Sequence, residues 1–112
     1  MLKLVKEEAG HLLVAVNLTE ANLNQSDHFK EELIALLNLK KRSVWLDLQT
    51  VTYVDSSFLG ALVAALKHAM TMQCDLVLLG LQKDIRDLLK LIRLDKVFKI
   101  YDSEQDALNA IG

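Results

Sequence analysis

The sequence predicts an α/β domain built on a mixed, mainly parallel β-sheet of four to five strands, with about four α-helices. From Val44 onward, segments typical of strand and helix alternate, which favours parallel strands joined by right-handed crossovers. The strand segments there are almost continuously apolar, as in strands covered on both faces. By contrast, two short strand segments flank Gly10 near the N-terminus and predict a β-hairpin.

The first half of the chain predicts this hairpin and one helix. Leu2–Lys6 and Leu12–Val16 are the two strands, and Gly10 supplies the turn between them. Residues 22–27 are rich in helix-capping side chains, and apolar residues then recur at helical spacing at Phe29, Leu33, Leu36 and Leu37. We expect this helix to end near Lys41.

The middle of the chain predicts a buried strand that leads into a second helix. Val44–Leu48 and Val51–Val54 have strand composition, so we expect a strand that arrives at Asp55. After it, one helical stripe running to about Gln73 is formed by Leu59, Leu62, Val63, Leu66 and Met70.

The last third predicts two further strands and two helices. Leu76–Leu79 and Val97–Tyr101 are the strands, and a helix over residues 85–94 lies between them. Ser103 with Asp106 resembles a capping box and opens a short final helix.

Length and charge restrict the classes of function. At 112 residues the chain suffices for one core, so we expect a single domain over residues 1–112. The formal net charge of −2 leaves no surplus of positive charge for nucleic acid or anionic membranes, and neither partner is predicted. No apolar run approaches the roughly 20 residues of a membrane span and no signal pattern opens the chain, so we predict no membrane insertion and a cytoplasmic protein.

The sequence also predicts no cofactor, no metal site and no enzymatic activity. The glycines form no phosphate-binding loop, Cys74 is the single cysteine, and His11 and His28 lie far apart in the sequence. A serine nucleophile would need a base and an oxyanion hole, and no His–Asp pair is evident.

The best candidate site is the junction Asp55-Ser56-Ser57, because ligands and partners of parallel sheets meet the loops at the carboxyl ends of strands. A phosphate on either serine would lie at the positive end of a helix dipole, yet would bring about −1.5 to −2 of charge into any interface there. The alternative interpretation is an ordinary helix N-cap.

Two further features keep two interpretations each. Ser57, Ala61, Ala64 and His68 share one helix side, which is either a docking face for a partner or a helix-favouring run of alanines with a solvated histidine. Asp47 either positions a phosphate near Ser56 or caps a turn.

Residues 55–60, Asp-Ser-Ser-Phe-Leu-Gly, resemble the Asp-Ser-Ser/Thr-Gly-Leu-Gly signature of the STAS domain family, the anti-sigma factor antagonists. The strands and helices on either side follow the order of that family over nearly the whole chain. The resemblance implies a STAS-type fold.

The resemblance also implies partner switching. The domain would bind an anti-sigma factor that is also a serine kinase and so free a sigma factor; the kinase would phosphorylate Ser56, with Ser57 as the alternative. Phe58 stands where the family usually has glycine, and we expect it to reshape the turn, hinder a kinase or contact a different partner. The partner-binding residues are therefore Asp55, Ser56, Ser57, Phe58, Ala61, Ala64 and His68. The alternative function is an unphosphorylated STAS subunit of a transporter, for example of a phospholipid ABC transporter, or of another signalling assembly.

Overall fold

A five-stranded mixed sheet forms the centre of the computed structural model, which describes residues 1–111. Its strand order is β1-β2-β4-β6-β7. The strands are β1 (Leu2–Glu7), β2 (His11–Val16), β4 (Ser43–Asp47), β6 (Leu76–Leu79) and β7 (Lys99–Tyr101). Strands β1 and β2 pair antiparallel as the predicted hairpin, and all other pairs in this sheet are parallel. The predicted α/β class and the mainly parallel sheet are confirmed.

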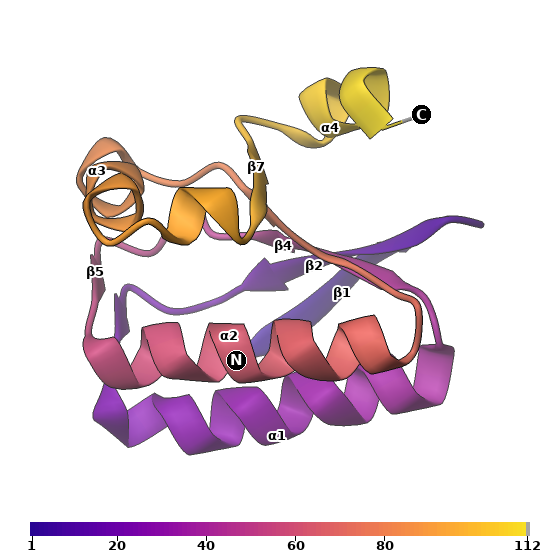
Figure 1. The fold of residues 1–112 in the computed structure, drawn as a ribbon. Coiled ribbons are helices and arrows are strands. Elements are labelled where there is room, and N and C mark those ends of the chain that lie inside the picture. The colour runs from indigo at the N-terminus through magenta and orange to yellow at the C-terminus, as the bar shows by residue number, and fades with distance from the viewer. Residues whose placement is uncertain (112) are drawn as a thin grey trace.

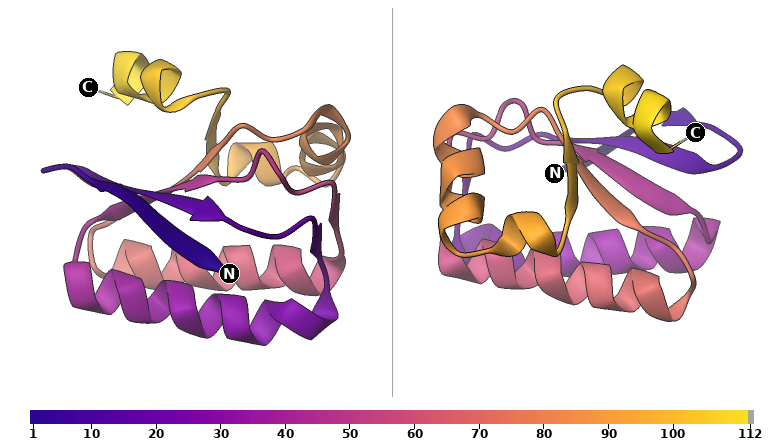
Figure 2. Two further views of the ribbon diagram at one scale, coloured as in Figure 1. Left: turned by 180° about the vertical axis from the view of Figure 1, so that it is seen from behind. Right: turned by 45° about the horizontal axis from the view of Figure 1, so that its top comes forward.

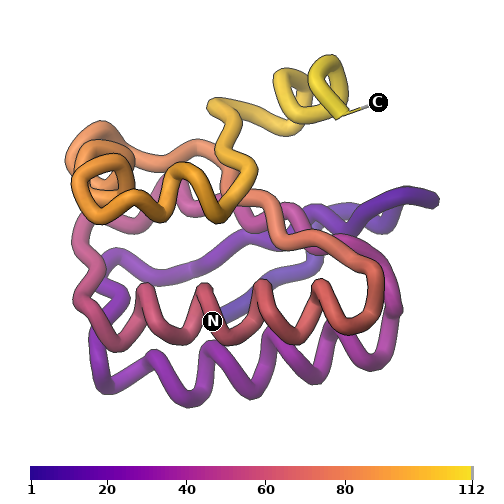
Figure 3. Tube along the Cα trace, in the orientation of Figure 1, coloured from indigo at the N-terminus to yellow at the C-terminus, as the bar shows by residue number. Residues whose placement is uncertain are grey.

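Two long helices cover one face of the sheet. Helix α1 (Leu23–Lys40) and helix α2 (Ser56–Thr71) lie side by side beneath it, and the front and rear views agree on this layering (Figure 1, Figure 2). The trace shows that both helices run in the same direction (Figure 3). Parallel strands joined by crossovers on one face impose that direction, so the N-termini of α1 and α2 are neighbours.

The main core lies between this helical layer and the sheet. Its largest fully buried side chains include Phe29 and Leu33 of α1, Phe58 and Leu62 of α2, and Leu46 of β4. Helix α3 (Lys83–Leu91) adds Ile85 and Leu89 to the same cluster.

Helix α4 (Glu104–Ile111) packs on the opposite face of the sheet (Figure 1). Trp45, Val77, Leu79 and the fully buried Ala107 of α4 form a second, smaller cluster there. His11 stacks on Trp45 with ring centroids 3.6 Å apart, and its Nε2 lies 3.0 Å from Glu104 Oε2. Lys6 Nζ donates to the other oxygen of Glu104 at 2.6 Å, so α4 is tied to the hairpin by charge as well as by packing.

The continuous strand expected to arrive at Asp55 is not present. Strand β4 ends at Asp47, whose Oδ1 accepts from the backbone N–H of Gln49 at 3.0 Å and turns the chain out of the sheet. The chain then forms a two-residue strand, β5 (Tyr53–Val54), which pairs in parallel with β3 (Glu20–Ala21) in a separate small sheet. A contact between two segments more than 30 residues apart leaves no signal in local composition, so β3 could not be predicted from the sequence.

The helix predicted over residues 85–94 is shorter than expected at its end. Arg93 adopts a left-handed backbone with φ of 67°, which ends α3 and starts the short 3-10 helix η1 (Leu94–Lys96) before β7.

Candidate functional site

Asp55 holds the N-termini of both long helices. Its Oδ1 accepts the N–H of Phe58 in the first turn of α2 at 2.9 Å, and its Oδ2 accepts the N–H of Leu23, the first residue of α1, at 2.8 Å. N-terminal N–H groups of a helix have no partner inside the helix. One carboxylate therefore satisfies a donor on each helix and fixes the spacing between them.

The local sequence explains why Asp55 reaches both helices. The β3–β5 pair brings the two chain segments together, and the N–H of Asp55 donates to the carbonyl of Ala21 at 3.1 Å. Asn22 then caps α1 through a capping box with Gln25. The predicted capping segment at residues 22–27 is confirmed, and it places the start of α1 beside the start of α2.

The two serines after Asp55 have different surroundings. Ser56 is the first residue of α2 and its side chain is exposed. Ser57 is half-buried and faces a groove between α1 and α2. Ser56 is therefore the more accessible hydroxyl, while Ser57 is part of the groove wall.

The groove between α1 and α2 has a volume of about 220 Å³ and small side chains along its α2 wall. Helix α1 contributes Leu23, Ser26, Asp27 and Lys30, and α2 contributes Ser57, Gly60, Ala61 and Ala64. Because the α2 wall carries no long side chain, a partner can approach that helix closely. We call this surface the α1–α2 groove.

The structure brings most of the predicted docking residues together. Ser57, Ala61 and Ala64 all line the α1–α2 groove. His68, three to four turns along α2, is not among the lining residues; its Nε2 lies 2.7 Å from Asn38 Oδ1 of α1. His68 thus bridges the two helices and does not contact Ser56 or Ser57.

Phe58 is a correction to the predicted partner-binding set. Its side chain is fully buried and packs against Phe29 of α1 with ring centroids 4.5 Å apart. It is not among the residues with positive φ, so helix α2 starts normally at this position without a glycine. Because the ring points into the core, Phe58 neither reshapes the turn nor offers a surface contact.

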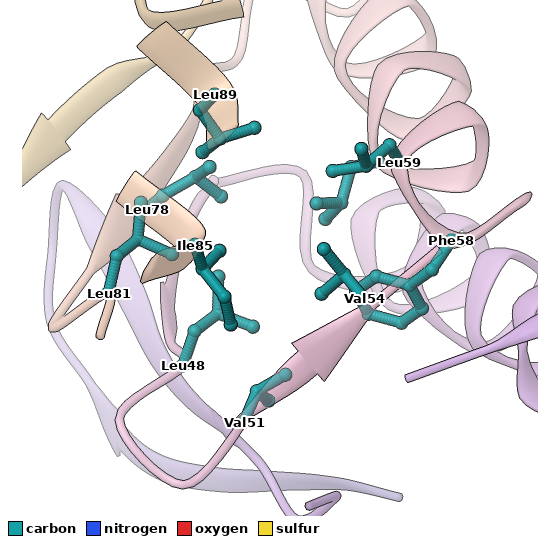
Figure 4. Close-up of a pocket in the computed structure, with 10 residues that line it drawn as sticks. Leu48, Val51, Val54, Phe58, Leu59, Leu78, Leu81, Ile85 and Leu89 are labelled. Atoms are coloured by element: carbon teal, nitrogen blue, oxygen red, sulfur yellow. The ribbon is translucent and has the colours of Figure 1, made fainter. Parts of the chain in front are cut away.

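Phe58 also closes the interior beside the junction. Val54, Phe58 and Leu59 face Leu81, Ile85 and Leu89 across the space between α2 and α3 (Figure 4). The cavity left between them has a volume of about 10 Å³ and apolar walls. That is about the size of a single water molecule, and apolar walls offer water no partners. The interior next to the junction therefore has no room for a ligand, and the site is a surface.

Asp47 acts as the cap of a turn. Its two carboxylate oxygens accept from the backbone and the side-chain amide of Gln49, at 3.0 and 2.8 Å. It lies at the end of β4 close to Gly80, whose φ of 68° favours glycine and where a Cβ would lie only 3.3 Å from Asp47 Oδ1. This supports the turn-capping interpretation of Asp47 over a role near Ser56.

The α1 wall of the groove was missed from the sequence. Ser26 and Asp27 fall in the predicted capping segment and Lys30 lies outside the predicted apolar stripe, yet all three line the groove. The available signal was their spacing, since residues 26 and 30 lie one helical turn apart on the face next to the buried stripe. Within residues 1–111, no group of three His, Cys, Asp or Glu side chains is placed to hold a metal ion.

Comparison with known families identifies the fold. The family model described as STAS domain matches residues 5–107, which is nearly the whole chain. The chain belongs to the STAS domain family. The Asp55–Ser57 junction and the α1–α2 groove are thus features of a STAS domain.

Solved structures of both signalling and transport proteins contain a similar fold. A Thermotoga maritima protein provisionally described as an anti-sigma factor antagonist is 25% identical, with a TM-score of 0.81 over 99% of this chain and 92% of that one. The phosphorylated form of the Bacillus cell fate determinant SpoIIAA is 11% identical, with a TM-score of 0.72 and complete coverage of both chains. The murine anion transporter Slc26a9 is 17% identical, with a TM-score of 0.78 over 92% of this chain but only 18% of the transporter.

None of the helices within residues 1–111 is both long and apolar enough to cross a bilayer.

Proposed function

We propose that this STAS domain is a non-enzymatic, cytoplasmic docking protein that acts as an anti-sigma factor antagonist. Its partner is an anti-sigma factor with serine kinase activity, and its docking surface is the α1–α2 groove together with the Asp55–Ser57 junction. The single observation that carries the proposal is the position of Ser56, an exposed hydroxyl at the start of α2 between the capping Asp55 and the groove-lining Ser57.

Phosphorylation of Ser56 would switch docking off. The first turn of a helix stabilises an added phosphate through its dipole and its free N–H groups. The same phosphate adds about −1.5 to −2 of charge beside Asp55, which opposes a partner by repulsion and by the cost of desolvation. The exposure of Ser56 supports it as the acceptor over the half-buried Ser57.

A second candidate function is supported by the likeness in fold to part of an anion transporter. In that case the domain would be a permanent, unphosphorylated subunit of a transporter, such as a phospholipid ABC transporter, and would use the same groove.

Purification from the native host distinguishes the two functions. The protein is isolated with its bound partners, the partners are identified, and phosphate is mapped by mass spectrometry. A kinase partner together with phosphate on Ser56 supports the antagonist. Recovery of a transporter ATPase, with no phosphate on Ser56 or Ser57 under any growth condition, would overturn it in favour of the transporter subunit.

A further inference from the structure

The end of α3 and the following η1 expose apolar side chains at the surface. Leu91 is 78% exposed, Ile92 44% and Val97 50%, whereas their neighbours Leu89 and Phe98 are buried in the core. A single exposed aliphatic residue is ordinary, but here three lie within seven positions of the chain. We call residues 90–97 the α3–η1 patch.

Basic side chains alternate with these apolar ones. Lys90, Arg93 and Lys96 are exposed, and none of them forms an ion pair within residues 1–111. Other basic residues of the same region do have partners: Lys83 pairs with Asp87, Arg86 with Asp102 and Lys99 with Asp75. The cations of the patch are therefore free to meet an external negative charge.

The charge of this region is opposite to that of the chain. Residues 90–97 contain three basic residues and one acidic residue, Asp95, a net charge of +2, in a chain whose formal net charge is −2. The net charge of −2 describes the whole chain and does not exclude an anionic partner at one part of its surface. Because salt screens charges over about 10 Å, an external anion close to the patch interacts with its local cations more than with the net charge of the whole chain.

The backbone holds the patch in a fixed shape. The N–H of Ile92 donates to the carbonyl of Leu88 at 3.1 Å, and the next residue, Arg93, turns the chain with a left-handed backbone conformation. The N–H of Phe98 donates to the carbonyl of Leu94 at 3.0 Å, and Leu94 packs against the core. Leu94 and Phe98 are thus anchored inward, whereas Lys96 and Val97 between them, and residues 90–93 before them, are exposed.

The chemistry of the patch fits a lipid surface better than a protein or a nucleic acid. Lysine is depleted at the centres of protein interfaces, and exposed aliphatic side chains gain nothing from a phosphate backbone, while the patch has no aromatic ring to stack on a base. At a membrane, aliphatic side chains enter the headgroup boundary while neighbouring lysine and arginine side chains keep their charge among anionic headgroups.

We propose that the α3–η1 patch binds the surface of an anionic membrane as a weak, reversible, peripheral contact. The patch shares no residue with the α1–α2 groove, so this activity is separate from the proposed partner docking.

Vesicle sedimentation tests the proposal with the full chain. Vesicles of phosphatidylcholine with about 40 mol% phosphatidylglycerol are compared with vesicles of phosphatidylcholine alone. We expect at least about tenfold stronger binding to the anionic vesicles at low salt, and loss of that preference at about 0.5 M salt. The variant with Lys90→Glu, Arg93→Glu and Lys96→Glu loses the anionic preference, and Leu91→Gln weakens binding severalfold without any change of charge.

A matched control separates the patch from the net charge. Lys3→Glu, Lys41→Glu and Lys67→Glu change the total charge equally at three exposed lysines that form no ion pair within residues 1–111. This triple variant is expected to retain at least half of the vesicle binding. Equal binding to neutral and anionic vesicles, an equal loss in the control, or binding to duplex DNA with none to vesicles would overturn the proposal.

Discussion

At the scale of single residues, Asp55 caps the N-terminus of α1 as well as that of α2. A cap normally satisfies its own helix, whereas each oxygen of this carboxylate accepts a donor from a different helix, at 2.9 Å from Phe58 N and 2.8 Å from Leu23 N. An aspartate in this position is therefore explained by the architecture alone, with or without a phosphorylated neighbour.

Replacement of Asp55 should measure this double cap. We expect Asp55→Ala to lower the free energy of unfolding by about 1–3 kcal/mol, because two helix N–H groups lose their acceptor. Urea unfolding followed by circular dichroism measures the loss. Asp55→Asn keeps one acceptor oxygen and should lose less; equal stability of wild type and Asp55→Ala would contradict the double cap.

Phe58 provides a second residue-scale prediction. Although glycine is usual in the family at this position, we expect Phe58→Gly to destabilise this chain by about 3 kcal/mol or more, through loss of a fully buried ring and of helix propensity. Chemical denaturation gives the value. Phe58→Leu, which keeps most of the apolar volume, should cost clearly less, and a stabilised glycine variant would show that the ring is not part of the core.

Helix α2 contains one glycine that its geometry does not require. Gly60 is exposed, has no positive φ, and a Cβ placed on it would meet nothing within 4 Å. We expect Gly60→Ala to raise the free energy of unfolding by about 1 kcal/mol, since glycine is a poor helix former. The same urea measurement tests this. A loss of stability would mean that the helix needs glycine here for a reason other than space.

At the scale of elements, the contacts of Glu104 with the hairpin predict that the attachment of α4 depends on pH. Lys6, through its hydrogen bond, holds the pKa of Glu104 below its usual range, and His11 adds a second hydrogen bond. Because the pKa is lower in the folded chain than in the unfolded one, Glu104 stabilises the fold above the unfolded pKa, and this contribution is lost as the pH falls through the folded pKa.

Acid titration of a variant measures that contribution. Below about pH 5, where an unperturbed glutamate begins to bind protons, wild type should lose stability more steeply than Glu104→Gln, which cannot titrate. Urea midpoints at several pH values measure the slopes. Glu31→Gln, at an exposed residue without an ion pair in residues 1–111, is the control and should follow wild type; parallel slopes for wild type and Glu104→Gln would contradict the linkage.

At the scale of the whole molecule, the two faces of the sheet are covered differently. The helical layer of α1 and α2 carries the junction and the groove, while α4 packs on the other face of the sheet (Figure 2). A docking switch confined to one layer can act without a change in the core, because added charge at the surface alone opposes the partner.

The affinity for the partner tests whether added charge at the junction opposes docking. We expect Ser56→Asp to weaken binding to the partner recovered from the host by more than about 1.4 kcal/mol, or tenfold, in isothermal titration calorimetry. Ser103→Asp places the same charge at the start of α4, away from the groove, and should leave affinity unchanged. Unchanged affinity of Ser56→Asp would mean that the junction is purely structural.

Local patterns were enough to predict most of the secondary structure and the junction. The apolar runs at Val44–Leu48 and Leu76–Leu79 correspond to β4 and β6. The helical stripe after Asp55 corresponds to α2, and the capping residues before Phe29 mark the start of α1. These elements are dictated by short-range periodicity and capping, which composition records directly. The order of strands and helices then restricts the topology.

Only the tertiary structure decided what the side chains at the junction do. It buried Phe58 against Phe29, joined Asp55 to Leu23, and formed one wall of the groove from α1. Each of these contacts joins residues about 30 positions apart, and such pairing depends on the packing of α1 against α2. The sequence by itself determined that a helix starts after Asp55; packing determined that Ser56 is exposed beside a groove while Phe58 is in the core.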